Sequence, residues 1–396
     1  GGRARTAAGT GKLCGALPKS MIVLHESRHL REYGFFRTLF RAVRKEGGSV
    51  RVEEERPFPR YHDDRSWHDG AWITWKESRV FVDMSDHVFQ FDPMALREAD
   101  LYLKANLHRG VAAKVFAGKN WADPGERLQP YTFLAPGLPR CRQIRWLAEA
   151  SGLRRRLRRP GTLCHVVGVY ENLLCDGDPE PREGEELTPN RMHFWIRYHF
   201  SRILRERAPA GSTVRLVSRG NPAIEDGRWV RPNLPYRSFL LRTLRADALV
   251  LNTFPHALDP WKALEAMALG VPVISEREPL VEVPEAYRLE PGKGRTEVIP
   301  GFGDFNLDRP LSDAASYRVL RWPGEERLRE GWERVLANRK EPEQARIAEQ
   351  WAGRFARERL GDVAIAINFG RQVEESFKEG SVAADRSMTN GSSCFS

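Results

Sequence analysis

Residues 246–275 read ADALVLNTFPHALDPWKALEAMALGVPVIS, and the pattern changes from strand to helix and back to strand. Ala248–Thr253 is an apolar run that suits a buried parallel strand. Asp259 is of a type that caps helices, and Pro260 fits a first helical position, where its missing N–H costs nothing. We therefore expect a helix over Trp261–Leu269.

The end of this predicted helix has signals of its own. Gly270 can adopt the left-handed conformation that ends many helices. Pro272 prevents the helix from continuing, and the expected strand is Val271–Ser275. A helix N-terminus at the carboxyl end of a parallel strand is where open α/β sheets bind anionic ligands. Three polar side chains lie at or just inside this expected mouth: Asp259, Lys262 and Glu265.

The segment Glu265–Ile274, EAMALGVPVI, resembles the nucleotide-sugar signature of GT-B glycosyltransferases. The resemblance is to the large retaining family called group 1 or family 4, whose pattern is E-A-M-A-x-G-x-P-V-I after a strand and an acidic loop. Pro235–Leu241 and Ala246–Asp247 also resemble the helix that precedes that strand in the family. The resemblance covers the C-terminal half well and the N-terminal half only by layout.

The resemblance implies an α/β fold with two Rossmann-like domains facing a cleft. The last helix of such enzymes commonly returns to the first domain, and Val363–Phe377 is the candidate here. The expected division is a disordered leader (1–20), an N-terminal acceptor domain ending in an Arg-rich linker (21–159), a C-terminal nucleotide-sugar domain (160–340), closing helices (341–379) and a disordered tail (380–396).

The donor site is expected around the start of the predicted helix. By resemblance, Glu265 accepts hydrogen bonds from the ribose hydroxyls of a nucleotide diphosphate sugar, and Ala266 belongs to the same motif. The alternative for Glu265 is an exposed ion pair with Lys262, three residues earlier. Lys262 is the best positive partner for the diphosphate. Asp259 caps the helix, and the backbone N–H groups of Trp261 and Lys262 are then available to a phosphate.

Ala257 is a clear departure from the family pattern. It stands where the family usually carries a first glutamate, eight positions before Glu265. His256 and Asp259 flank this position, so one of them can replace the contacts of that glutamate. The other interpretation is that the donor phosphate is held differently.

A second departure is the missing arginine–lysine pair after the first strand of the C-terminal domain. Residues 168–172, GVYEN, contain no cation. Arg191, at the start of the following helix, or Arg219, at the end of the next strand, is a candidate substitute. Each of the two can equally be an ordinary surface arginine.

The acceptor side is expected in the N-terminal half. His25 and Glu26 follow the first predicted strand, where GT-B enzymes often bring a loop to the acceptor. Gly34 can let the backbone approach a ligand, or it can simply start a helix. Asp86 and His87 are the catalytic candidates, since a base there would indicate inversion at the sugar carbon. The alternative for these polar residues is a role as loop caps.

Composition limits the possible classes of protein. The chain of 396 residues is 41% apolar, which is enough for packed cores, and no run approaches the ~18 apolar residues of a membrane span. Its five cysteines are odd in number and show no C-x-x-C spacing. This pattern argues against a disulfide framework or a zinc site and favours a reducing compartment. We therefore expect a cytoplasmic protein.

The net charge of +10 makes acidic partners plausible. Much of the excess lies in an arginine cluster between Arg140 and Arg159. One interpretation is a solvated helix and linker, and another is a peripheral contact with the inner membrane face or a lipid-linked acceptor. Nucleic acid is not expected, because no zinc finger, RNP aromatic motif or helix-turn-helix accompanies the arginines.

The sequence therefore predicts a transferase that moves a sugar from a nucleotide diphosphate donor to a saccharide, lipid-linked or other acceptor, with retention implied by the family. A nucleotide-sugar epimerase of the same fold and a catalytically silent nucleotide-sugar-binding protein are the alternatives. No tightly bound cofactor is expected. Because a lysine, an arginine and a helix N-terminus can neutralise the departing diphosphate, a divalent metal is not expected to be essential.

Overall fold

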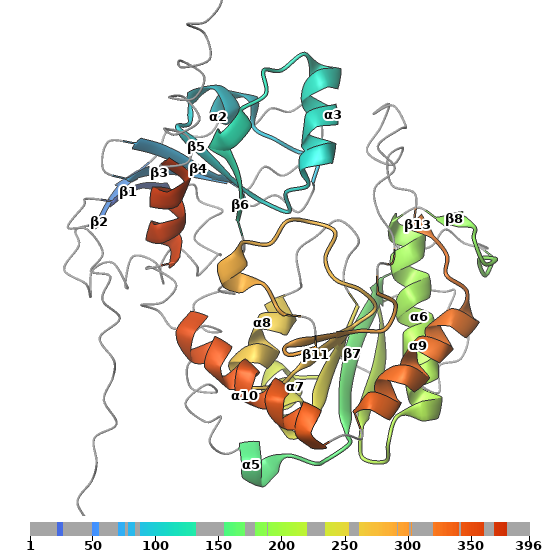
Figure 1. Ribbon diagram of the computed structural model, residues 1–396. Coiled ribbons are helices and arrows are strands. Elements are labelled where there is room, and N and C mark those ends of the chain that lie inside the picture. The colour runs from blue at the N-terminus through green and yellow to red at the C-terminus, as the bar shows by residue number, and fades with distance from the viewer. Residues whose placement is uncertain are drawn as a thin grey trace, which may run out of the picture.

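A computed structural model of the chain shows two larger β-sheets with helices around each, and a short two-stranded sheet (Figure 1). The residues that it describes are 22–26, 50–54, 70–75, 78–83, 88–131, 154–170, 179–187, 189–219, 234–252, 261–290, 292–300, 302, 320–339, 342–359 and 368–377.

The first sheet has six strands in the order β2-β1-β3-β4-β5-β6. Its strands are β1 (Ile22–Glu26), β2 (Val50–Glu54), β3 (Gly70–Trp75), β4 (Ser78–Asp83), β5 (Leu101–Ala105) and β6 (Leu128–Tyr131). β3 runs antiparallel to both β1 and β4, and the other neighbours are parallel. Trp75 pairs with Ser78, and so short a connection permits only an antiparallel hairpin. The first lobe is therefore a mixed sheet with a parallel part.

Two helices of the first lobe have no counterpart in the sequence-based expectations. α2 (Pro93–Glu98) starts with a proline, and its cap is Asp92, whose Oδ1 accepts from the Ala95 N–H at 2.9 Å. α3 (Arg109–Lys119) is capped by His108, and a 3-10 turn, η2 (Gly125–Arg127), precedes β6. The helices cover a core that includes Phe91 and Phe116.

The second sheet is parallel throughout and has the order β12-β11-β10-β7-β9. Its strands are β7 (Leu163–Tyr170), β9 (Thr213–Arg219), β10 (Ala248–Leu251), β11 (Val273–Ser275) and β12 (Arg295–Glu297). The chain passes from β7 to β9 on one side and then returns to place β10 on the other side of β7. Such a reversal is a topological switch point, and ligands of open α/β sheets bind beside it at the carboxyl ends of the strands.

The strand–helix–strand unit predicted from residues 246–275 is present, with bounds that differ by a few residues. α8 (Trp261–Ala268) connects β10 to β11. Gly270 has φ +72°, the left-handed value expected for a helix C-terminus. The N–H of Val271 bonds the carbonyl of Ala266 at 2.8 Å, and the N–H of Gly270 bonds that of Met267 at 2.9 Å. These two bonds form a Schellman motif, so the helix ends where the glycine and proline predict.

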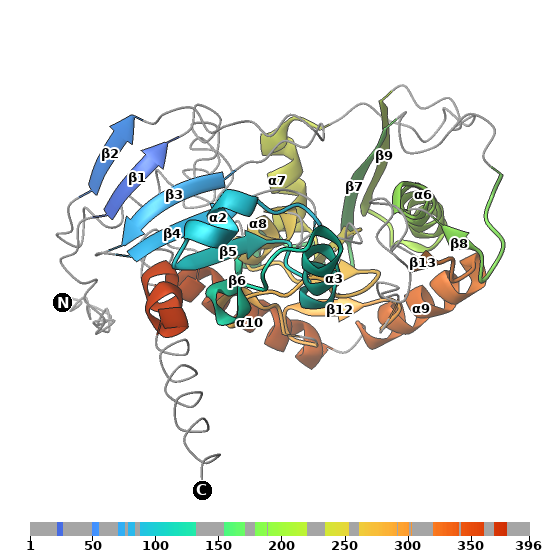
Figure 2. The same cartoon turned by 90° about the horizontal axis from the view of Figure 1, so that it is seen from above.

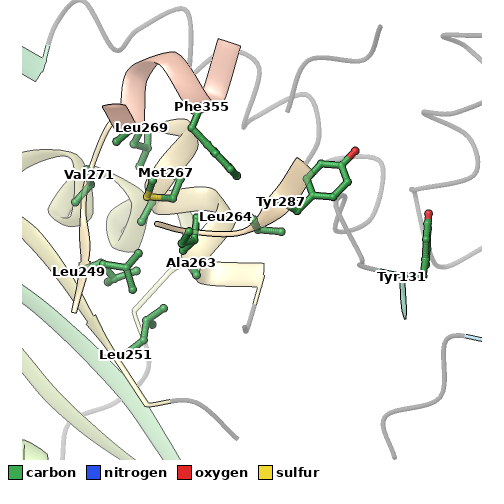
Figure 3. Close-up of a cluster of buried hydrophobic side chains, with 14 of the residues drawn as sticks. Tyr131, Leu249, Leu251, Ala263, Leu264, Met267, Leu269, Val271, Tyr287 and Phe355 are labelled. Atoms are coloured by element: carbon green, nitrogen blue, oxygen red, sulfur yellow. The ribbon is translucent and has the colours of Figure 1, made fainter. Parts of the chain in front are cut away.

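Helices cover both faces of the second sheet (Figure 1). One face carries α7 (Tyr236–Arg245), α8 and α10 (Pro342–Arg359), and the other carries α6 (Pro189–Arg207) and α9 (Glu325–Asn338). Along β10 the side chains alternate: Leu249 and Leu251 join the cluster that includes Met267 and Phe355 of the α8 face (Figure 3), and Val250 joins the α6 face. A short pair, β8 (Glu186–Leu187) and β13 (Leu320–Arg321), lies beside α6.

The last described helix, residues 368–377, returns to the first sheet, as the resemblance implies (Figure 2). Phe369 lies 5.8 Å from the ring of Trp75 and 6.0 Å from the ring of Tyr131, measured between centroids. Gln372 donates a hydrogen bond to the carbonyl of Pro130 at the end of this sheet. The C-terminal helix of the described part, which follows the second lobe in the chain, therefore packs on the first lobe.

A segment after β11 makes a further contact between the lobes. The N–H of Glu282 donates to the carbonyl of Leu107 at 2.7 Å, and the Arg109 guanidinium lies 3.3 Å from the Glu282 carboxylate. The 3-10 turn η5 (Glu285–Tyr287) follows, and Tyr287 projects from it toward Tyr131 of β6 (Figure 3).

The interpretation of the arginine cluster as a solvated linker or a membrane contact is wrong for two of its members, which hold parts of the fold together. Arg154, in the short helix α5 (Arg154–Leu157), is 5% exposed and donates at 2.8 Å to the carbonyls of Leu244 and Ala246. It also pairs with Glu349 of α10 at 3.0 Å. Burial lowers its pKa, and Glu349 opposes that effect. Arg154 is therefore neither a solvated linker residue nor available to a membrane.

Arg158 has a similar structural role. It pairs with Asp247, the residue before β10, and with Glu349 at 3.0 Å. Residues 140–153 lie outside the described part, so the membrane interpretation of the cluster stays a prediction for them. Among the described residues, no helix is both long enough and apolar enough to cross a membrane.

His165 of β7 links the second sheet to α6, and its titration can be used to test the packing between them. Its ring is fully buried, with Nδ1 at 3.1 Å from the carbonyl of Val250 and Nε2 at 2.9 Å from the Ser201 hydroxyl. Burial lowers its pKa from 6.5 to about 4, and the bond to Val250 opposes this only partly. The neutral ring is therefore the folded form.

We expect the free energy of unfolding to fall as the pH falls from 6.5 to about 4, because the unfolded chain then binds a proton that the buried ring does not. The contribution of His165 is about 3 kcal/mol over that window. Urea unfolding at several pH values, with His165→Asn as the comparison, measures it. An equal pH dependence in the variant and the wild type would contradict the assignment to His165.

Candidate functional site

Glu265 lies in α8, next to the switch point of the second sheet, and its side chain is buried at 1% exposure. The hydroxyl of Tyr236, at the start of α7, donates a hydrogen bond to its Oε1. This excludes the interpretation of Glu265 as one half of an exposed ion pair. The sheet edge thus holds a buried carboxylate with an oriented donor, as a residue that accepts bonds from ligand hydroxyls requires.

The Lys262 side chain extends toward β7 and not toward Glu265. Its Nζ donates to the carbonyl of Val166 at 3.3 Å and lies 5.3 Å from the centre of the Phe239 ring. Its charge helps to lower the pKa of His165, after burial as the main cause. The ammonium group is therefore at the switch point, where a phosphate at the start of α8 would lie.

The carboxyl end of β11 adds further buried polar groups that sequence analysis did not select. Glu276 is 0% exposed and Arg277 is 2% exposed. Arg277 donates to the carbonyl of Phe302 at 3.2 Å, and Ser275 donates to the carbonyl of Arg277 at 2.8 Å. Burial also lowers the pKa of Arg295, on β12, to about 10. The edge around the switch point is polar and shielded from solvent, which strengthens electrostatic contacts to a ligand.

The remaining donor candidates are spread over several places. Arg191 is engaged locally, with Glu185 at 3.3 Å and the carbonyl of Pro179 at 3.4 Å. Ala266 is fully buried in the core under α8. Arg219 ends β9 and Trp261 starts α8, but their side chains lie outside the described atoms. His256 and Asp259 lie outside the described residues, and so does Ala257.

The acceptor candidates are only partly described. His25 and Glu26 form the end of β1, at the carboxyl edge of the first sheet, and their side chains are outside the described atoms. Gly34, Asp86 and His87 lie outside the described residues. Their proposed roles therefore stay predictions.

A buried ion pair occupies the carboxyl edge of the first sheet. Asp83 ends β4 and lies opposite Lys104 of β5 in the register, with Lys104 Nζ 3.3 Å from Asp83 Oδ2. The hydroxyl of Tyr102 donates to the same oxygen at 2.5 Å. Burial, followed by the charge of Asp83, raises the pKa of Tyr102 well above its usual value. Asp83 is thus part of a buried network.

One group of described residues has the spacing of metal ligands: Glu180, His199 and Glu325. It fits a metal poorly. Arg202 already donates to Nδ1 of His199 at 3.2 Å, and Nε2 lies 3.0 Å from a Glu180 carboxylate oxygen without a hydrogen bond to it. Arg202 also pairs with Glu325, so a guanidinium already supplies the positive charge. An Asp-x-Asp triplet, Asp176–Asp178, lies outside the described residues.

Tyr236 is the contact that sequence reasoning missed at this site. It lies 29 residues before Glu265 and on a different helix, so no local spacing connects the two. The only signal was its place in the helix that precedes β10, a part of the sequence that already resembles the family.

No protein-family model matches the sequence, and no curated protein matches it. Among solved structures, the chain is similar to HepE from Anabaena in complex with UDP and glucose, at 14% identity and a TM-score of 0.39, over 73% of this chain and 70% of that chain. It is also similar to the catalytic domain of starch synthase IV from Arabidopsis thaliana bound to ADP and acarbose, at 12% identity and a TM-score of 0.34, over 72% of this chain and 57% of that chain.

A third similar structure is sucrose-phosphate synthase from Thermosynechococcus elongatus, at 13% identity and a TM-score of 0.34, over 87% of this chain and 93% of that chain. These proteins are glycosyltransferases of the GT-B fold. At TM-scores this low, the functional assignment rests on the residues of the site.

Proposed function

We propose that this protein is a glycosyltransferase that takes a sugar from a nucleotide diphosphate donor. The observation that carries the proposal is the buried Glu265 carboxylate, held by the Tyr236 hydroxyl beside the switch point of a parallel sheet. A carboxylate accepts hydrogen bonds from two neighbouring hydroxyls, and a ribose presents such a pair. The sequence motif and the geometry thus favour the same ligand.

The leaving diphosphate needs its growing negative charge neutralised. Lys262 and the backbone N–H groups at the start of α8 supply positive potential on the same side of the switch point. This arrangement supports departure of the diphosphate without a bound metal. The family that the motif resembles retains configuration at the sugar carbon, and we extend the proposal to retention here.

The test is a thermal-shift screen with nucleoside diphosphates, followed by assays of transfer and hydrolysis with the matching nucleotide sugars. We expect at least one nucleoside diphosphate to raise the unfolding midpoint of the wild type, and EDTA to leave both binding and turnover unchanged. Isomerisation of the nucleotide sugar alone would favour an epimerase. Binding with neither transfer nor hydrolysis would favour a silent binding protein, and no binding at all would contradict the proposal.

A further inference from the structure

Asn252 follows β10 directly and is 4% exposed. Within the described part of the chain, neither its Oδ1 nor its Nδ2 has a hydrogen-bond partner. It is the described residue with two unpaired buried side-chain atoms. A buried polar atom without a partner destabilises a fold by about 1–3 kcal/mol, so such groups are rare unless a ligand or another role accounts for them.

The position of Asn252 is that of a ligand-binding residue. β10 is the middle strand of the parallel sheet, and Val250 pairs with Ile274 of β11 on one side and His165 of β7 on the other. Asn252 lies two residues further toward the carboxyl edge, at the switch point between β7 and β10. This is the edge at which an open α/β sheet binds its ligand.

Asn252 and α8 flank this edge from opposite sides. Leu251 packs on the face covered by α8, and Val250 packs on the face covered by α6. The alternation of a strand therefore assigns Asn252 to the α6 face. The Lys262 ammonium, bonded to the carbonyl of Val166, marks the same edge from the α8 side.

We propose that the Asn252 carboxamide binds hydroxyls of the sugar that is transferred, and this inference rests on the proposed function. A phosphate oxygen only accepts hydrogen bonds and would leave Oδ1 unpaired, whereas two neighbouring sugar hydroxyls can both donate and accept. The ribose and the diphosphate are assigned to Glu265 and Lys262 on the α8 side. The group left for the opposite side is the sugar.

The variant Asn252→Leu separates this role from a structural one. Leucine has a similar size and removes both unpaired atoms, so we expect the ligand-free variant to unfold at the same temperature as the wild type or higher. Calorimetric dissociation constants for UDP, ADP and GDP, and for UDP-glucose, ADP-glucose and GDP-mannose, give the affinity gained from the sugar. We expect that gain to fall about tenfold, with the affinity for the diphosphate unchanged.

Asn368→Leu is the matched control. Asn368 is also buried, at 8% exposure, and its Nδ2 is unpaired in the described part of the chain. It lies on the helix over residues 368–377, which packs on the first sheet and not at the switch point. Its substitution is expected to leave the affinity gained from the sugar unchanged.

The other possible results contradict either the role of Asn252, its assignment to the sugar, or the proposed function. If Asn252→Leu binds diphosphates and nucleotide sugars as the wild type does, the role of Asn252 is wrong and the proposed function stands. If both classes of ligand weaken equally, the amide contacts the nucleotide and the assignment to the sugar is wrong. If the wild type binds none of these compounds, the proposed function fails, and the role of Asn252 fails with it.

Discussion

Glu265→Gln is expected to weaken nucleoside diphosphate binding by about 10- to 100-fold, because hydrogen bonds from ribose hydroxyls to a charged acceptor contribute about 1.5–3 kcal/mol. Glutamine keeps the shape of the side chain and a carbonyl oxygen that can accept from the Tyr236 hydroxyl. The unfolding midpoint of the ligand-free protein should therefore change little. Isothermal calorimetry with the diphosphate that stabilises the wild type most is the measurement.

Tyr236→Phe is the control for this result, because it removes the hydroxyl that positions the carboxylate but leaves the carboxylate itself. We expect a smaller loss of affinity than for Glu265→Gln, of about tenfold or less. An equal affinity in Glu265→Gln and the wild type would show that the carboxylate does not touch the nucleotide. Equal losses in the two variants would instead show that Glu265 depends wholly on Tyr236 for its position.

The sequence predicts the strand–helix–strand unit around α8 well because its signals are local. The unit around α8 has an apolar strand, a helix-ending Gly270 and the breaker Pro272, and each acts within a few residues. The antiparallel β3 follows from the pairing of Trp75 with Ser78, which a run of strand residues does not reveal. α3 was missed because its sequence, RGVAAKVFAGK, is small and weakly patterned and is capped by a histidine.

In the candidate site too, the residues of a local motif can be predicted from the sequence, and the others cannot. The motif selects Glu265 and Lys262, since both lie within one helix whose start can be recognised from the sequence. It does not select Asn252, because an asparagine after a strand has no pattern of its own, and only burial without a partner distinguishes it. Arg154 was selected for the wrong reason, because a run of arginines indicates only charge. The carbonyls that hold this side chain lie 90 and 92 residues further along the chain, so no local pattern reveals them.

Asp83→Asn and Lys104→Met are each expected to lower the free energy of unfolding by about 3–5 kcal/mol, because each leaves a buried charge without the opposite charge it now faces. In the wild type the ammonium and the carboxylate oxygen are 3.3 Å apart, and the two side chains are 0% and 3% exposed. The amide introduced by Asp83→Asn would still offer an oxygen to the Tyr102 hydroxyl. Urea unfolding of the full chain measures the loss.

The double variant, Asp83→Asn with Lys104→Met, tests whether charge is the cause. With both charges gone, neither member of this pair is left facing a neutral side chain, so the double variant should be more stable than either single variant. A loss equal to the sum of the single losses would show that the two charges do not stabilise each other, which contradicts the prediction. Since Asp83 lies at the carboxyl edge of the first sheet, a recovered double variant also allows a direct comparison of sugar transfer with and without the pair.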